Sequence, residues 1–174
     1  DSADTHHSIN SFVFSPGGSL YMQEGTFHHT GVETPWGPPV RSFNAGVFRF
    51  EPRSKRFEVY AAYGFANPHG HVFDRWGQDF VTDGTGAVPY WGTATSVHTE
   101  HPRKVGGAPA VYRQRTRPCG GTAILSSAHF PEAMQGNWLV TNCIGFLGVL
   151  QYRFADDGAG FKATEVEPLL SSSD

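Results

Sequence analysis

Two histidines separated by a single glycine, His69 and His71 in "NPHGH", are the residues whose types and spacing best suit chemistry. Neutral imidazoles bind divalent metal ions, and an imidazole beside a carboxylate can act as a general base. On an extended segment, residues i and i+2 share a face, so both rings could reach one ion or one substrate. The alternative is an ordinary polar loop, because loop backbones at the surface need polar partners.

Further polar side chains follow in segments that could join this pair. Asp83 in "TDGTG" supplies a carboxylate, either for catalysis or as the cap of a tight turn. His28 and His29 in "EGTFHHT" add two imidazoles, although neighbours on a strand point to opposite faces. We therefore predict His69, His71 and Asp83 as catalytic residues, and the four histidines as metal ligands.

An internal repeat organises the chain. The stretches "VFSPGGSLYMQEG" and "VFDRWGQDFVTDG" match at a fixed offset, and the turn glycines Gly18, Gly77 and Gly136 keep that same spacing. Each unit reads as a strand, a turn containing glycine and an alternating strand, which predicts a β-hairpin. Two further strand pairs are expected at 45–62 and 148–168. No segment has an apolar stripe of helical period with caps, so almost no helix is predicted.

Four strands in each repeating unit are typical of β-propeller blades. We predict an all-β chain in which residues 1–174 form one propeller segment, with blades at about 8–66, 67–117 and 118–174. A long insertion obscures the outer strands of the second blade. Closed rings usually need at least four blades, so the chain is either half of a six-bladed propeller or one half of a homodimeric ring. The first interpretation is favoured.

Composition excludes several classes of protein. The 174 residues suit one domain, and 14% aromatic residues with 21 glycines and 12 prolines favour short strands joined by turns. A formal charge of -3 gives no basic surface for nucleic acid. No run of 18 apolar residues predicts a membrane span. The polar start, without Met or a secretory apolar region, indicates a processed protein or a piece of a larger one.

Propeller geometry would gather several of these residues at one mouth. The loops leading into the first strands, and those joining second to third strands, open on the same face. In "RQRTRPCGG" the side chains of Arg113, Arg115 and Arg117 alternate, as expected of an anion site or of a charged edge strand. Arg117 is the better functional candidate, because it directly precedes the loop that begins a blade.

The two cysteines would lie at the same mouth. Cys119 aligns with His69, since "RPCGG" and "NPHGH" share a Pro-X-Gly frame, and Cys143 follows in "TNCIG". A disulfide, two free thiols and a metal role all remain open. A disulfide would fit an extracytoplasmic location.

Several long segments resemble one family: "FANPHGHVFDRWGQDFVTDGTGAVPY", "RQRTRPCGG", "HFPEAMQGNWLVTN" and "EVEPLLSSSD". It is the membrane-bound dehydrogenase domain of large secreted proteins from planctomycete-type bacteria, which often carry a c-type haem domain. At superfamily level the chain resembles six-bladed glucose/sorbosone dehydrogenases, which use pyrroloquinoline quinone (PQQ). The resemblance implies a periplasmic or secreted oxidoreductase acting on a sugar or alcohol, with PQQ and calcium as cofactors.

The motif shared with those quinoproteins is only partly kept. Where the relatives read approximately G-H-R-N-P-Q-G, this chain has "GFANPHG". The resemblance implies cofactor binding by Asn67 and Arg117, but Phe65 and Ala66 replace the His and Arg of the motif. Loss of a bidentate Arg weakens the expectation of PQQ. Two functions remain: an oxidoreductase, or a non-catalytic propeller that binds carbohydrate or protein.

Overall fold

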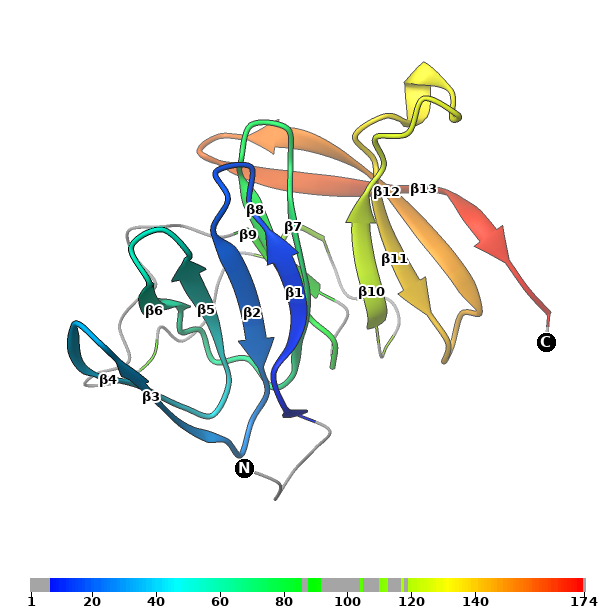
Figure 1. Cartoon of the computed structure of the whole chain (residues 1–174). Coiled ribbons are helices and arrows are strands. Elements are labelled where there is room, and N and C mark those ends of the chain that lie inside the picture. The colour runs from blue at the N-terminus through cyan, green and yellow to red at the C-terminus, as the bar shows by residue number, and fades with distance from the viewer. Residues whose placement is uncertain are drawn as a thin grey trace.

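The chain folds into antiparallel β-sheets, shown in Figure 1 as a computed structural model. The structure describes residues 7–85, 88–91, 104, 110–112, 117 and 119–173. The first sheet has the order β1-β2-β5-β6, and the hairpin β3-β4 is inserted between β2 and β5. The bounds are β1 Asn10–Phe14, β2 Leu20–Glu24, β3 His29–Thr34, β4 Gly37–Phe43, β5 Gly46–Glu51 and β6 Arg56–Ala61.

Two more sheets follow along the chain. The second sheet has the order β7-β8-β9, and an isolated bridge between Tyr90 and Ala110 lies on its outer side. The third sheet has the order β10-β11-β12-β13, with a short 3-10 turn before β11. The bounds are β7 Pro68–Phe73, β8 Asp79–Asp83, β9 Val88–Trp91, β10 Cys119–Ile124, η2 Glu132–Met134, β11 Trp138–Asn142, β12 Gly148–Asp157 and β13 Gly160–Ser171.

The all-β prediction and the predicted hairpins are confirmed. The expected pairs at 45–62 and 148–168 are β5-β6 and β12-β13. Hairpin β3-β4 is not predicted from the sequence, because its segment reads as a polar loop. The first strands of the three sheets, β1, β7 and β10, lie side by side in Figure 1. Within the described ranges, no helix is long and apolar enough to cross a membrane.

The sequence repeat corresponds to one repeated turn. Gly18, Gly77 and Gly136 all have left-handed backbones, with φ of 87°, 86° and 78°. The Gly18 amide donates to the Ser15 carbonyl at 2.9 Å, and the Gly77 amide to the Asp74 carbonyl at 3.1 Å. A side chain at these φ values is strained, which explains why glycine recurs at this position.

A β-bulge also recurs near the start of each first strand. The register shifts between Asn10 and Val13 in β1, between Pro68 and His71 in β7, and between Cys119 and Gly121 in β10. A bulge adds a residue to one strand of a pair and changes which side chains face the core. The predicted alternation of side chains is therefore interrupted at the same place in all three units.

Two aromatic cores join the sheets in sequence. Between the first and second sheets, Tyr21 and Tyr60 pack against Phe73 and Val81. Between the second and third, the ring of Phe80 meets three rings of the third sheet, those of Trp138, Phe154 and Phe161. The second sheet is thus covered on both faces, whereas each of the two outer sheets meets a neighbouring sheet on one face.

The tryptophans behave differently from one another. The sequence places all four in the packing between blades, with Trp91 as a possible sugar platform. Trp138 is fully buried between sheets, and Trp91 packs edge-on against Phe161 at 6.1 Å. The expectation is wrong for Trp36 and Trp76, which are 73% and 80% exposed. Both lie in turns, where the chain reverses and no neighbouring sheet can cover them.

Replacement of Gly18 by alanine should lower the free energy of unfolding by about 1–2 kcal/mol, because of its left-handed backbone. Gly17→Ala is the matched control. Its φ is not positive, and a new methyl group would meet only the Ser15 hydroxyl at an ordinary 3.8 Å. Urea denaturation of both variants checks this, and equal losses would contradict the turn assignment.

Candidate functional site

His71 lies in the core between the first and second sheets, not at a mouth. Its side chain is fully buried, and Nε2 is 3.0 Å from Asp79 Oδ2. The ring contacts those of Tyr21 and Phe73, with centroids 5.0 and 4.8 Å away. A catalytic or metal-binding role for His71 was predicted from its spacing. The structure instead shows a core histidine held by a buried carboxylate.

The predicted shared face of His69 and His71 is also wrong, because of the bulge in β7. Pro68 pairs with Asp83 and His71 with Val81. Since Val81 and Asp83 alternate regularly on β8, the side chains of Pro68 and His71 share a face and His69 belongs to the bulge. His69 is half-buried. Among the residues that the structure describes, no three His, Cys, Asp or Glu side chains gather as a metal site would require.

Asp79 organises a buried polar network across the first two sheets. The Tyr60 hydroxyl donates to Asp79 Oδ1 at 3.1 Å, while His71 occupies Oδ2. Burial raises the pKa of Tyr60, and the nearby Asp79 carboxylate raises it further. Burial also raises the pKa of Tyr21, opposed by a hydrogen bond to Arg49. Both phenols are therefore held in the neutral form: the Tyr60 hydroxyl donates to Asp79, and the Tyr21 oxygen accepts from Arg49.

Asp83 is a structural cap, the alternative considered from the sequence. Its Oδ2 accepts from the Ala66 amide at 2.9 Å, and Oδ1 accepts from the amides of Asn67 and Thr85 at 3.1 Å. These bonds fix the loop leading into β7 and the turn after β8. Burial raises the pKa of Tyr90, and the Asp83 carboxylate raises it further. Because both oxygens of Asp83 already accept backbone amides, a role as catalytic base is poorly supported.

His28, just before β3, and His29, the first residue of β3, lie in different environments. His28 is buried, and its carbonyl accepts from the Asn44 amide at 3.1 Å. His29, the first residue of β3, is exposed, and its ring lies edge-on to Phe43 at 5.0 Å. Among the described residues, neither histidine joins His69 in a group that could hold a metal ion.

The remaining predicted residues lie around the start of β10. Arg117 is exposed, while Arg113 and Arg115 fall outside the described residues. Cys143 is exposed with a free thiol, and the possible disulfide with Cys119 stays a prediction. Antiparallel pairing does set Cys119 opposite Asn142, next to Cys143 in the chain, as the blade geometry implied. The side chain of Cys119 lies outside the described part.

The start of β7 does not offer the donors that PQQ and calcium would need. Phe65, at the position of the motif's histidine, is buried, with its ring 5.3 Å from Tyr63 and 6.0 Å from Tyr90. Ala66 contributes a backbone amide to Asp83 in place of a guanidinium. With Asp83 capped by amides and His71 in the core, the described residues do not fit this cofactor.

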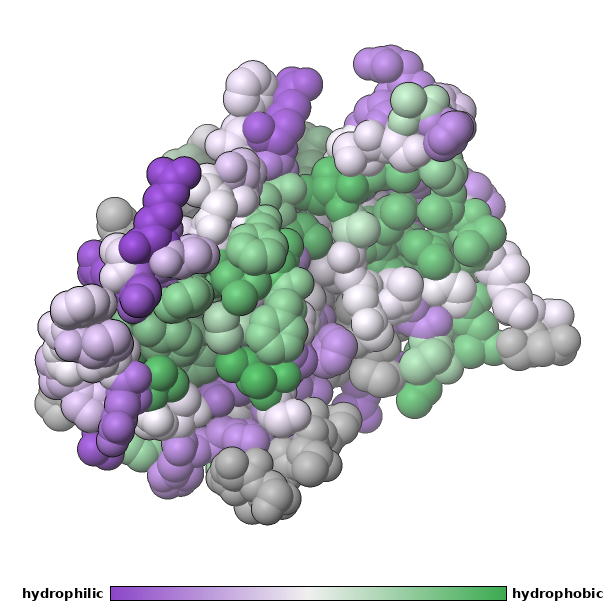
Figure 2. Space-filling model, viewed as in Figure 1, coloured by the Kyte–Doolittle hydropathy of each residue, from purple (hydrophilic) through white to green (hydrophobic). Residues whose placement is uncertain are grey.

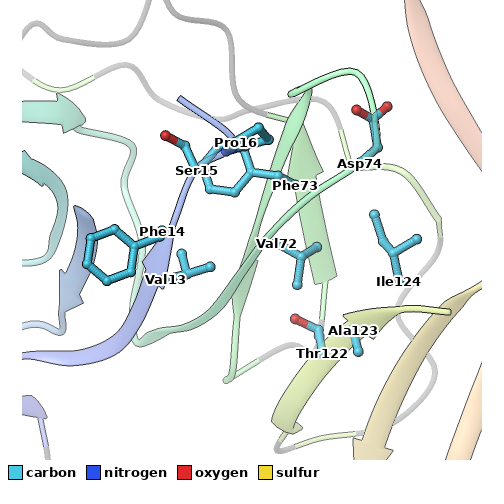
Figure 3. Close-up of a pocket in the computed structure, with 10 residues that line it drawn as sticks. All are labelled: Val13, Phe14, Ser15, Pro16, Val72, Phe73, Asp74, Thr122, Ala123 and Ile124. Carbon is cyan, nitrogen blue, oxygen red and sulfur yellow. The ribbon is translucent and has the colours of Figure 1, made fainter. Parts of the chain in front are cut away.

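Hollows lie instead at the opposite end of the sheets, beside the repeated turns. A cavity of 420 Å³ follows the three first strands, which Figure 3 shows side by side. Val13 of β1 lies toward Val72 of β7 in this view, whereas Phe14 points away from β7. Phe73, Asp74 and Ile124 also line a larger neighbouring cleft, so the two hollows adjoin each other.

The larger cleft, of 960 Å³, opens between the second and third sheets. Aromatic side chains from both sheets line it, and polar side chains from the turns join them. The aromatic residues are Phe73, Trp76, Phe80, Phe154 and Phe161. The charged residues are Asp74, Arg75, Glu132 and Asp156. An apolar lining with a few polar groups is the usual composition of a small-molecule site.

Trp76 is held in place although it is exposed. Asp74 Oδ1 accepts from the amides of Trp76 and Gln78 at 2.8 and 2.9 Å, which fixes the turn. The Arg75 guanidinium lies 4.7 Å from the centre of the indole, a cation–π distance. The sequence analysis did not predict a binding role for Trp76. The signal that could have indicated one was a large aromatic residue directly before a turn glycine.

Asp79→Ala should lower the free energy of unfolding by about 3 kcal/mol, because it leaves the Tyr60 hydroxyl and His71 Nε2 without their partner in the core. Asp157→Ala is the control. This exposed carboxylate lies 3.6 Å from Lys162, and its loss should change stability by no more than about 0.5 kcal/mol. Thermal denaturation compares the two. Equal small effects would show that the network does not join the sheets.

The sequence matches no protein-family model, and no curated protein matches it significantly. The resemblance to the dehydrogenase domain therefore stays a prediction, and function is argued below from the geometry of the described residues.

Proposed function

We propose that this chain is a β-propeller segment that binds carbohydrate in the cleft between its second and third sheets. Support for a propeller comes from the repeated turn and bulge, and from first strands that lie side by side. The second sheet, with its three strands and the bridge at Ala110, is consistent with a blade whose outer strand is short. Blades of four antiparallel strands are the unit of propellers.

The exposed indole of Trp76 at the edge of the cleft is the observation that carries the proposal. A sugar ring has an apolar face of C–H groups and a polar edge of hydroxyl groups. An aromatic face can cover the first, and carboxylates can accept hydrogen bonds from the second. Glu132 and Asp156, both exposed, supply such carboxylates at the same cleft. Its 960 Å³ lies within the range of ordinary ligand sites.

Trp76→Ala should weaken binding of a soluble oligosaccharide about tenfold or more, because exposed aromatic platforms dominate binding energy at such sites. Isothermal titration with cellohexaose, xylohexaose and mannohexaose measures this. Trp36→Ala is the matched control: Trp36 is almost equally exposed, at 73%, but lies in the β3-β4 turn and not at the cleft. Absence of binding to every oligosaccharide, or equal loss in both variants, would contradict the proposal.

An oxidoreductase is the second candidate, and the start of β7 is the observation that favours it. The half-buried His69 lies in a bulge beside Gly70, whose φ is 127°. The buried Asn67 Oδ1 has no hydrogen-bond partner within the described residues. Unpaired buried polar atoms concentrate at functional sites.

If this second function is right, the chain supplied with a redox cofactor and a panel of sugars should reduce an acceptor dye. His69→Ala should slow that reduction, because His69 is the histidine of the pair that lies outside the core. His29→Ala, which changes an exposed imidazole on β3, is the control. Spectrophotometry of the dye measures the rate. No reduction by the unmodified chain would rule against the oxidoreductase.

A further inference from the structure

The two internal interfaces follow one rule. The face of the first sheet that carries Tyr21 covers the face of the second sheet that carries Val81. The opposite face of the second sheet carries Phe80, the repeat equivalent of Tyr21. It covers the face of the third sheet that carries Val140, the repeat equivalent of Val81. Each sheet therefore has a back face that covers the next sheet and a front face that is covered by the one before.

Among the described residues, no preceding sheet of the row covers the front face of the first sheet, although Met22 and Phe48 on this face are buried within the chain. Cross-strand pairs put Phe14, Leu20, Phe50 and Phe57 on one face. Phe14 is the repeat equivalent of Phe73, which packs in the core, yet Phe14 is 63% exposed. Figure 2 shows hydrophobic residues gathered over β1 and β2.

The back face of the third sheet has no sheet after it. Leu139 is the repeat equivalent of Phe80 and points away from the core, since its neighbours Trp138 and Val140 point into it. The pairing register sets Val149 and Leu170 on the same face, and Leu170 is 62% exposed. Apolar side chains thus occupy the position from which Tyr21 and Phe80 cover their neighbours.

We infer that the front face of the first sheet binds the back face of the third sheet of a second copy of this chain. The contact continues the rule that already joins the three sheets. Two copies related by a twofold axis make this contact twice, which covers the outer faces of the first and third sheets in both copies and closes a ring of six sheets. Six lies within the usual number of propeller blades, and closure removes the exposed faces that would otherwise favour aggregation.

The oligomeric state of the full 174-residue chain tests the inference. Sedimentation velocity should give twice the chain mass of 19.0 kDa, across about a hundredfold range of concentration. Phe14→Asp on the front face and Leu170→Asp on the back face should each yield monomers. Ile144→Asp should remain dimeric, because Ile144 is as exposed as Leu170, at 62%, but lies in the loop between β11 and β12.

Mixing the two variants tests which faces meet. In a mixed pair, the intact front face of the Leu170→Asp copy meets the intact back face of the Phe14→Asp copy, so one of the two contacts is restored. A dimer should therefore reappear in the mixture. If two front faces met each other instead, Leu170→Asp alone would remain dimeric and the mixture would contain no dimer formed from both variants.

Three results would overturn the inference: a monomeric unmodified chain at every concentration, a dimer that is insensitive to Leu170→Asp, or an Ile144→Asp variant that dissociates like the other two. Far-UV circular dichroism checks that the variants keep their sheets. Because Phe14 and Leu170 are largely exposed within one copy, their replacement should leave the fold of that copy intact.

Discussion

The buried carboxylate of Asp79 is the interaction that fixes how the first two sheets meet. A carboxylate taken out of water is tolerated only when hydrogen bonds replace those of the solvent. Asp79 obtains them from Tyr60 of the first sheet and His71 of its own. Both partners must therefore point into the same interface, and the aromatic rings of Tyr21 and Phe73 close around them. Because His71 bonds to this carboxylate in the core, its ring does not reach the end of the sheet where a catalytic or metal site was predicted.

The polar groups at the two ends of the sheets have different roles. At the end where β7 starts, the polar groups that suggested a site mostly stabilise the backbone: Asp83 caps two loops, and Gln23 bonds both backbone groups of Gly70. At the end with the repeated turns, Trp76 projects from a turn fixed by Asp74. Turns between first and second strands are free to carry binding residues, because core packing does not determine their side chains.

Local patterns predicted the hairpins well, because a left-handed glycine such as Gly77 and alternating apolar residues act over a few neighbours. The role of His71 could not be predicted in this way. The bulge that turns it into the core is a property of pairing with β8, and its partner Tyr60 comes from another sheet. Hairpin β3-β4 was missed because "EGTFHHT" reads as a polar loop. The position of Trp76 directly before the turn glycine Gly77 predicts exposure. Its large aromatic side chain predicts packing in a core instead.

The repeat also explains why the two proposed surfaces are independent. The cleft lies between the second and third sheets, where the back face of one sheet meets the front face of the next. The docking faces are the front of the first sheet and the back of the third, which lie at the two ends of the row. Pairing of two copies would therefore leave the cleft open at the turns. Loss of dimerisation in a Phe14 variant would remove the ring without removing Trp76 from its cleft, because different interfaces position these two side chains.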